Sequence, residues 1–133
     1  MGNRAVIGFI SKEGIKNKDS VGIYLHWNGG RDSVEGFLAT AKQYGVRTNE
    51  NYGVARLIQI IANTLGGTLS LGVDQIKNLD CDNYDNGLYW VDNNFDIVGR
   101  EYNTNEEQTE HPLEDFIKHC KKANDLHFIG ESQ

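Results

Sequence analysis

Two consecutive amphipathic segments in the first half of the chain constrain the fold most strongly. From about residue 32 to residue 44, apolar residues recur at positions 0, +3, +4 and +7, which predicts a helix with one apolar face. These residues are Val34, Phe37, Leu38 and Ala41. From about residue 51 to residue 65 the apolar stripe is wider, which predicts a helix that is covered on most sides. Both helices must bury their apolar faces against another layer of structure.

Short apolar segments predict a sheet that can form this layer. Residues 4–10 are apolar on both faces, which predicts a central strand, and residues 21–26 predict a second strand antiparallel to it. Residues 68–73 alternate in polarity and predict a third strand. Residues 87–92 and 95–101 predict a hairpin, whose turn at Asn93 and Asn94 would supply the positive φ that tight turns require.

Pro112 predicts the start of a last helix, because proline is tolerated in the first turn. The apolar stripe of that helix is Leu113, Phe116, Ile117 and Cys120. We therefore expect an α+β fold, with one domain over residues 1–133. Its mostly antiparallel sheet would be covered on one face by two to three helices.

Composition indicates a globular protein without a membrane span or a metal site. The 133 residues are 38% hydrophobic and 24% charged, and they contain no apolar run near the roughly 20 residues of a membrane span. With no signal peptide at the start, we expect a cytoplasmic protein without membrane contact. Cys81 and Cys120 lack metal-ligand spacing, so we expect free thiols, no metal and no cofactor.

The net charge of −6 is unevenly distributed along the chain. Residues 1–60 hold 8 Lys and Arg against 5 Asp and Glu, whereas residues 61–133 hold 5 against 14. A chain this acidic is a poor candidate for binding long nucleic acid, which requires a basic face. A small anionic ligand in a local basic pocket is compatible with this charge. Because guanidinium groups grip phosphate in two places, such a pocket would use some of the five arginines.

The segment HWNGG, residues 26–30, joins the second predicted strand to the first predicted helix. Gly29 and Gly30 would let a phosphate approach the positive end of this helix, where Arg31 could clamp it. The alternative is a plain strand-to-helix turn, with Trp27 packed into the core or into a subunit contact.

The connector LDCDNYDNG, residues 79–87, is dense in side-chain oxygens and amides. Its spacing does not fit a calcium loop, because an EF-hand that starts at Asp80 would have Tyr84 at its fifth position. Asn83 and Asp85 could instead read ribose hydroxyls or a base edge, with Tyr84 stacked on either. The alternative is a connector made of side-chain turns.

Arg100 lies at the end of a predicted strand beside this connector and could face a pocket floor. The alternatives are that its side chain extends outward to solvent or that it pairs with an acid. We expect Arg47 and Arg56 on the surface and Phe9 in the core. The four histidines occur in unrelated contexts, and neither cysteine has the signature of a nucleophile. The sequence therefore favours binding over catalysis.

The pieces NRAVI, YLHWNGGRDSVEGFL, YGVARLIQIIANTLGGTLSLGV, LDCDNYDNGLYWV and IVGRE resemble phage proteins of the Thoeris anti-defence 1 group. The likeness covers about residues 3–101, and HWNGGRDSV and DCDNYDNG are its most specific parts. It implies a phage protein in the host bacterial cytoplasm that sequesters a 1''-2' or 1''-3' glyco-cyclic ADP-ribose signal without degrading it. It also implies a homo-oligomer, a dimer or hexamer with ligand pockets between protomers, and in some members a second site for cyclic di- or trinucleotides.

The resemblance also implies roles for individual residues. Asn83 and Asp85 would contact the ribose or base, Arg100 and Arg47 would face the pyrophosphate, and Phe9 would stack on adenine. Two alternatives stay open. One is an enzyme that degrades such a signal, and the other is an acidic protein that inhibits a defence nuclease by mimicking nucleic-acid charge.

Overall fold

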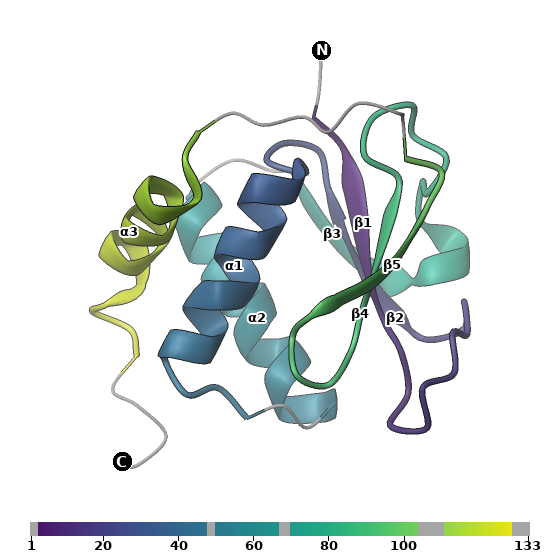
Figure 1. Cartoon of the computed structure of the whole chain (residues 1–133), viewed down its shortest axis with the longest axis horizontal. Helices are drawn as coiled ribbons and strands as arrows, with labels where there is room; N and C mark the ends of the chain where they lie inside the picture. The colour runs from purple at the N-terminus through teal and green to yellow at the C-terminus, as the bar shows by residue number, and fades with distance from the viewer. Residues whose placement is uncertain (1–2, 48–49, 67–69, 104–110, 129–133) are drawn as a thin grey trace.

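The computed structural model describes residues 3–47, 50–66, 70–103 and 111–128 (Figure 1). The strands are β1 (Ala5–Phe9), β2 (Val21–Leu25), β3 (Leu71–Gln75), β4 (Leu88–Val91) and β5 (Ile97–Glu101). The helices are α1 (Arg31–Gln43), α2 (Glu50–Leu65) and α3 (Leu113–Asn124), with a short 3-10 helix η1 (Ile76–Asn78). The structure thus confirms the expected α+β class.

The five strands form one sheet in the order β3-β2-β1-β4-β5, so β1 is central as predicted. β1 pairs antiparallel with β2 and parallel with β4, and the other two pairings are antiparallel. The predicted third strand at 68–73 is observed at Leu71–Gln75, and residues 67–69 lie outside the described part. The sheet is therefore mixed but mostly antiparallel.

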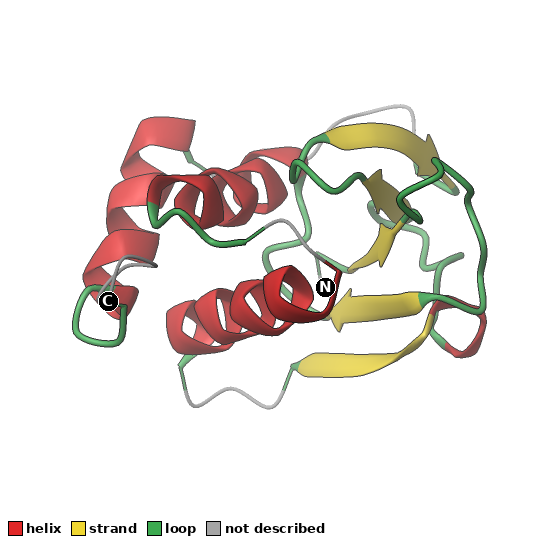
Figure 2. Cartoon of the chain, turned by 90° about the horizontal axis from the view of Figure 1, so that it is seen from below, coloured by secondary structure: helices red, strands yellow, loops and turns green. Residues whose placement is uncertain are grey.

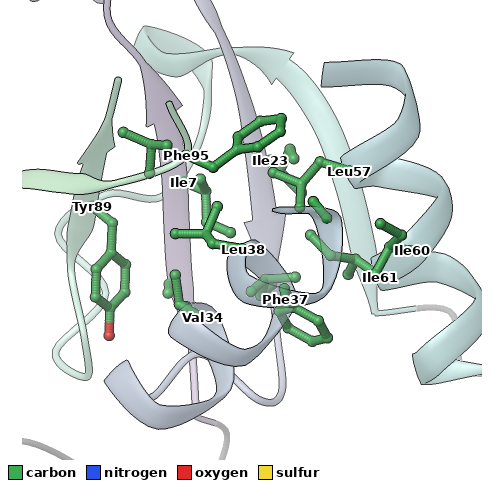
Figure 3. Packing of buried hydrophobic residues seen from close by; sticks show 14 of the residues in the cluster. Ile7, Ile23, Val34, Phe37, Leu38, Leu57, Ile60, Ile61, Tyr89 and Phe95 are labelled. Carbon is green, nitrogen blue, oxygen red and sulfur yellow. The ribbon is translucent and has the colours of Figure 1, made fainter. Parts of the chain in front are cut away.

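All three helices lie on one side of this sheet. The odd-numbered residues of β1 (Ala5, Ile7 and Phe9) face the helices, because successive side chains of a strand alternate between faces. They pack in one core with α1 and α2, which supply Val34, Phe37, Leu38, Leu57, Ile60 and Ile61 (Figure 3). α3 packs on α1 and α2 on the side away from the sheet (Figures 1 and 2).

A smaller apolar cluster covers part of the opposite face. Its buried members are Val6, Ile76, Leu88 and Trp90. Leu79 and Cys81 from the connector are partly buried against them. The connector that appears polar in sequence therefore also forms part of a second, minor core.

The hairpin turn between β4 and β5 differs from the prediction in one detail. The positive φ of +61° falls on Phe95 and not on Asn93 or Asn94. The ring of Phe95 is buried in the main core, and the Asp92 carboxylate accepts bonds from the backbone N–H groups of Asn94 and Asp96. Burial of the ring and these two bonds outweigh the ordinary preference of asparagine for this conformation.

Within the described ranges, the structure contains no helix that is long and apolar enough to cross a membrane.

Candidate functional site

The HWNGG turn, the connector and Arg100 meet at one end of the sheet. Tyr89 donates its hydroxyl to the Gly29 carbonyl at 2.7 Å, and Arg100 donates from Nη2 to the Asn86 carbonyl at 2.9 Å. The Asn86 side chain donates in turn to the side-chain oxygen of Asn3. We call this group, Asn3, Gly29, Asn86, Tyr89 and Arg100, the Arg100 corner.

Gly29 packs against the start of β1, where there is no room for a side chain. Its N–H donates to the Asn3 carbonyl at 2.8 Å. A Cβ atom at Gly29 would lie 2.5 Å from that carbonyl oxygen and 2.7 Å from the Cβ of Ala5. Gly29 therefore lets the turn lie directly against the start of β1. Gly30 is the N-cap residue of α1, in an extended conformation and without a side-chain cap.

The start of α1 already holds an anionic group. Asp32 is 8% exposed, and its carboxylate accepts from Ser33 N at 2.8 Å and from His111 N at 3.0 Å. Arg31 donates from Nε to Glu35 at 2.8 Å. Because a carboxylate occupies the positive end of the helix dipole, this arrangement disfavours a phosphate at the same amides.

The side chains of Asn83 and Asp85 form hydrogen bonds with other residues of the chain, and these bonds stabilise the conformation of the connector. Asn83 is fully buried; its side-chain oxygen accepts from the N–H groups of Asp85 and Gly87, and its amide donates to the Asp80 carbonyl. Asp85 accepts from the Arg4 backbone at 3.1 Å and from Arg4 Nε at 2.8 Å. That hydrogen bond raises the pKa of the Arg4 guanidinium above its ordinary value.

Arg100 and the Arg4–Asp85 pair lie at the same end of the sheet but on different faces. Tyr89, the register partner of Arg100, belongs to the main core, so Arg100 lies on the helix-facing side. Arg4 precedes Ala5, whose side chain faces the helices, and alternation along the strand places Arg4 on the other side. Within a single chain, a ligand that binds on one face of the sheet therefore does not contact both Arg100 and Asp85.

The exposed aromatic candidates lie on the turn and the connector. Tyr84 is 80% exposed and has a φ of +63°. Trp27 is 43% exposed, with its ring edge-on to His26 at 5.2 Å between centroids. The idea that Trp27 packs into the core of its own chain is therefore wrong, whereas its contact with a ligand or a second subunit stays a prediction.

Phe9 and Arg47 do not belong to this corner. Phe9 is buried in the main core at the opposite end of β1 from Asn3, as its core interpretation predicts. Arg47 is exposed beyond the end of α1, where its guanidinium lies 5.2 Å from the centroid of the Tyr52 ring. Within one chain, neither residue is placed to share a ligand with Arg100.

At the start of α1, Asp32 and Ser33 lie close to the ring of His111, but the three side chains do not have the arrangement of a catalytic triad. The Nε2 atom of His111 lies 3.1 Å from Ser33 Oγ and 3.8 Å from Asp32 Oδ2. Both partners therefore approach the same ring nitrogen, whereas a catalytic relay uses one nitrogen for each. Ser33 is also fully buried. Among the described residues, no group of three or more His, Cys, Asp or Glu could hold a metal ion.

Two clefts lie beside α1. One, of about 310 Å³, runs between α1 and the β4–β5 hairpin. Its lining includes the ion pairs Arg31–Glu35 and Lys42–Asp96 and the apolar residues Leu38 and Phe95. The other, of about 320 Å³, is lined by Asn28, His111, Asp115, Phe116 and His119. Among the residues predicted to bind ligand, Arg31 lines the first of these two clefts, and none lines the second.

The sequence analysis missed Asn3, Arg4, Asn86 and Tyr89. Tyr89 could not have been found by pairing the predicted hairpin strands, because a two-residue turn at Asn93 and Asn94 would pair Arg100 with Gly87. The observed register, shifted by an irregularity at Trp90 and Val91, pairs Arg100 with Tyr89. The side-chain contacts of Asn3 with Asn86 and of Arg4 with Asp85 join residues more than 80 positions apart, and no local pattern signals them. Comparisons with protein-family models, with curated proteins and with solved structures found no match to this chain.

Proposed function

We propose that this chain is a non-catalytic sponge that binds and sequesters a cyclic ADP-ribose-type signalling nucleotide. The observation that carries the proposal is the meeting of the HWNGG turn, the connector and Arg100 in one corner. The turn and the connector belong to the most specific pieces of the resemblance to the Thoeris anti-defence 1 group, HWNGGRDSV and DCDNYDNG. By this proposal the protein acts in the cytoplasm of a phage-infected bacterium and blocks Thoeris immunity.

Arg100 is the residue that would bind the pyrophosphate. Its guanidinium is held by the Tyr89 ring and by the Asn86 carbonyl, so little side-chain entropy is lost when a phosphate binds. A planar guanidinium also matches two phosphate oxygens at once. This local cation explains how a chain with a net charge of −6 could hold an anionic ligand.

Exposed aromatic rings near the corner would hold the adenine. Trp27 lies two residues before Gly29, and Tyr84 lies two residues before Asn86. Both rings are substantially exposed, so a base can stack on either of them without displacing core residues. Asn83 and Asp85 would act indirectly, by fixing the connector that carries Tyr84 and the Asn86 carbonyl.

A homo-oligomer would explain the predicted residues that lie elsewhere. Phe9 is buried in the main core, and Arg47 is exposed beyond the end of α1. In the proposed sponge, each pocket would lie between protomers, and Arg47 of a second copy could face the same ligand. Phe9, at 8% exposure, would need a rearrangement to take part, so we give it no role in the pocket.

The test is a calorimetric titration with purified 1''-2' and 1''-3' glyco-cyclic ADP-ribose, followed by mass spectrometry of the ligand. We expect binding of at least one isomer and no change in its mass. Arg100→Ala should weaken that binding, and Arg56→Ala should not, because Arg56 is exposed on α2 and bonded to Gln59. A changed ligand mass would support the degrading enzyme, and absence of binding by the wild-type protein would reject the proposal.

A further inference from the structure

Asn3 lies two residues before β1 and is 5% exposed. Its backbone N–H donates to the His26 carbonyl at 3.0 Å, and its backbone carbonyl accepts from the Gly29 N–H at 2.8 Å. These two bonds flank Trp27, whose exposed ring is a candidate surface for the base. The main chain of Asn3 therefore holds the HWNGG turn against the sheet.

The side chain of Asn3 contacts the connector in the same corner. Its oxygen accepts from the Asn86 side-chain amide, which also donates to the Arg4 carbonyl at 3.1 Å. The Asn86 backbone N–H donates to the same Arg4 carbonyl, again at 3.1 Å. Because Asn86 makes three hydrogen bonds to the chain just before β1, the direction of its own carbonyl is fixed.

The Asn86 carbonyl is the group that accepts from Arg100 Nη2 at 2.9 Å. The next residue, Gly87, has a φ of +68°, and a Cβ atom there would lie 2.1 Å from the Glu101 carbonyl oxygen. The end of the connector and the end of β5 are therefore in backbone contact beside Arg100. A change in the orientation of Asn86 would be transmitted directly to the guanidinium.

The Asn3–Asn86 pair contributes more to geometry than to stability. A hydrogen bond between two neutral buried groups gives little net stability over an apolar pair of the same shape. Buried polar groups whose hydrogen bonds are made nevertheless select one arrangement of the core. Asn86 is 2% exposed, so both members of this pair are buried and their bonds determine how the corner is arranged.

We propose that Asn3 is a positioning residue of the ligand site. Its backbone holds the turn that carries Trp27, and its side chain, through Asn86, sets the orientation of Arg100. One residue thus fixes the group that stacks on the base relative to the group that binds the pyrophosphate. The consequence for binding rests on the proposed function, whereas the positioning of Arg100 is tested without any nucleotide.

The Nε–H resonance of Arg100 in the ligand-free protein tests the positioning. Arg100 Nε is buried, and the guanidinium lies 3.9 Å from the centroid of the Tyr89 ring, so the proton chemical shift depends on its place over that ring. Loss of the resonance in Arg100→Lys assigns it. We expect it to move in Asn3→Ala, which loses the side-chain oxygen but keeps both backbone bonds. It should also move in Asn3→Leu, which keeps a branched side chain without the oxygen.

Asn63→Ala is the matched control for both variants. The Asn63 amide donates to the Asn124 side-chain oxygen at 2.8 Å, so this change also breaks an amide pair, but between α2 and α3. It should leave the Arg100 resonance in place, and circular dichroism checks that each variant is folded. An unchanged resonance in either folded Asn3 variant would overturn the proposal. Loss of folding in both Asn3 variants would also overturn it, because the role of the side chain would then be stability.

Calorimetric titration with glyco-cyclic ADP-ribose tests the consequence for binding. One neutral hydrogen bond corresponds to a factor of about five in affinity, so we expect Asn3→Ala to bind about fivefold more weakly and Asn63→Ala to bind like wild type. If the wild type binds and Asn3→Ala binds equally well, the proposed function stands and the role of Asn3 is overturned. If the wild type binds no nucleotide, the proposed function is rejected, and the Arg100 resonance still decides whether Asn3 positions this side chain.

Discussion

The guanidinium of Arg100 lies 3.9 Å from the centroid of the Tyr89 ring, across the register of β5 and β4. Tyr89 is fully buried and donates its hydroxyl to the Gly29 carbonyl. The ring that holds the arginine is therefore itself fixed to the turn before α1. The position of Arg100 is thus set by the packing of the sheet, and the account of nucleotide binding depends on that position.

Replacing Arg100 separates the charge of the side chain from its shape. Arg100→Ala should weaken binding of the cyclic nucleotide by about 1.5–3 kcal/mol, the scale of hydrogen bonds to a charged group. Arg100→Lys keeps the charge but loses the planar donor fork, so it should recover only part of that loss. Calorimetric titration of both variants measures the difference. Equal affinity of Arg100→Lys and wild type would show that charge alone is required.

Tyr89→Phe tests the bond between the sheet and the turn. The change leaves the Gly29 carbonyl without the hydroxyl that donates to it at 2.7 Å, in a buried position. We expect the free energy of unfolding to fall by about 1–3 kcal/mol, measured by urea denaturation. Tyr52→Phe, at a residue that is 57% exposed, should change stability by less than about 0.5 kcal/mol. An equal effect of both changes would contradict the role given to Tyr89.

Gly29→Ala tests why the turn requires glycine. The added Cβ would lie 2.5 Å from the Asn3 carbonyl oxygen, so the turn or the start of β1 must shift. Overpacking of this kind costs about 1–3 kcal/mol. Gly72→Ala is the control, since its Cβ would meet the Cβ of Tyr24 at an ordinary 3.7 Å. Thermal unfolding at equal protein concentration compares the two, and a fully stable Gly29→Ala variant would contradict the close approach.

Glu101 should contribute to the dependence of stability on acid. The hydrogen bond from Trp90 Nε1 at 2.6 Å, followed by the charge of Lys18, lowers the pKa of Glu101 below its ordinary value of 4.5. A carboxylate whose pKa is lowered by folding stabilises the protein above the unfolded pKa. That contribution is lost as pH falls from about 4.5 through the lower folded value. Urea denaturation between pH 7 and pH 3 should therefore show a shallower loss for Glu101→Gln than for wild type, and identical slopes would contradict this role.

The sequence predicted the elements of the fold better than their pairing. The apolar stripe of α1, for example Val34 and Phe37, depends on local spacing, and local spacing can be read directly. The parallel pairing of β1 with β4 joins residues about 80 positions apart, and no local pattern specifies it. The positive φ at Phe95 likewise follows from burial of its ring in a core that forms only after the strands have paired.

In the candidate site, too, local features could be predicted from the sequence and long-range contacts could not. Arg100 and the connector were predicted to be neighbours, because adjacent hairpin strands must lie side by side, and the Arg100–Asn86 bond agrees with this. The inward orientation of Asn83 was not predicted, because an asparagine that binds backbone groups and one that binds a ligand look alike in sequence. The pairing of Arg4 with Asp85 depends on the sheet order and was missed for the same reason as the β1–β4 pairing.

A capture-and-release experiment tests the central claim most directly. The purified protein is incubated with extract from cells whose Thoeris alarm is active, then washed and heat-denatured, and the released molecules are weighed by mass spectrometry. The account predicts an intact cyclic ADP-ribose mass released from the wild-type protein and strongly reduced release from Arg100→Ala. Protein that releases no nucleotide, or that releases a hydrolysed product, would contradict it.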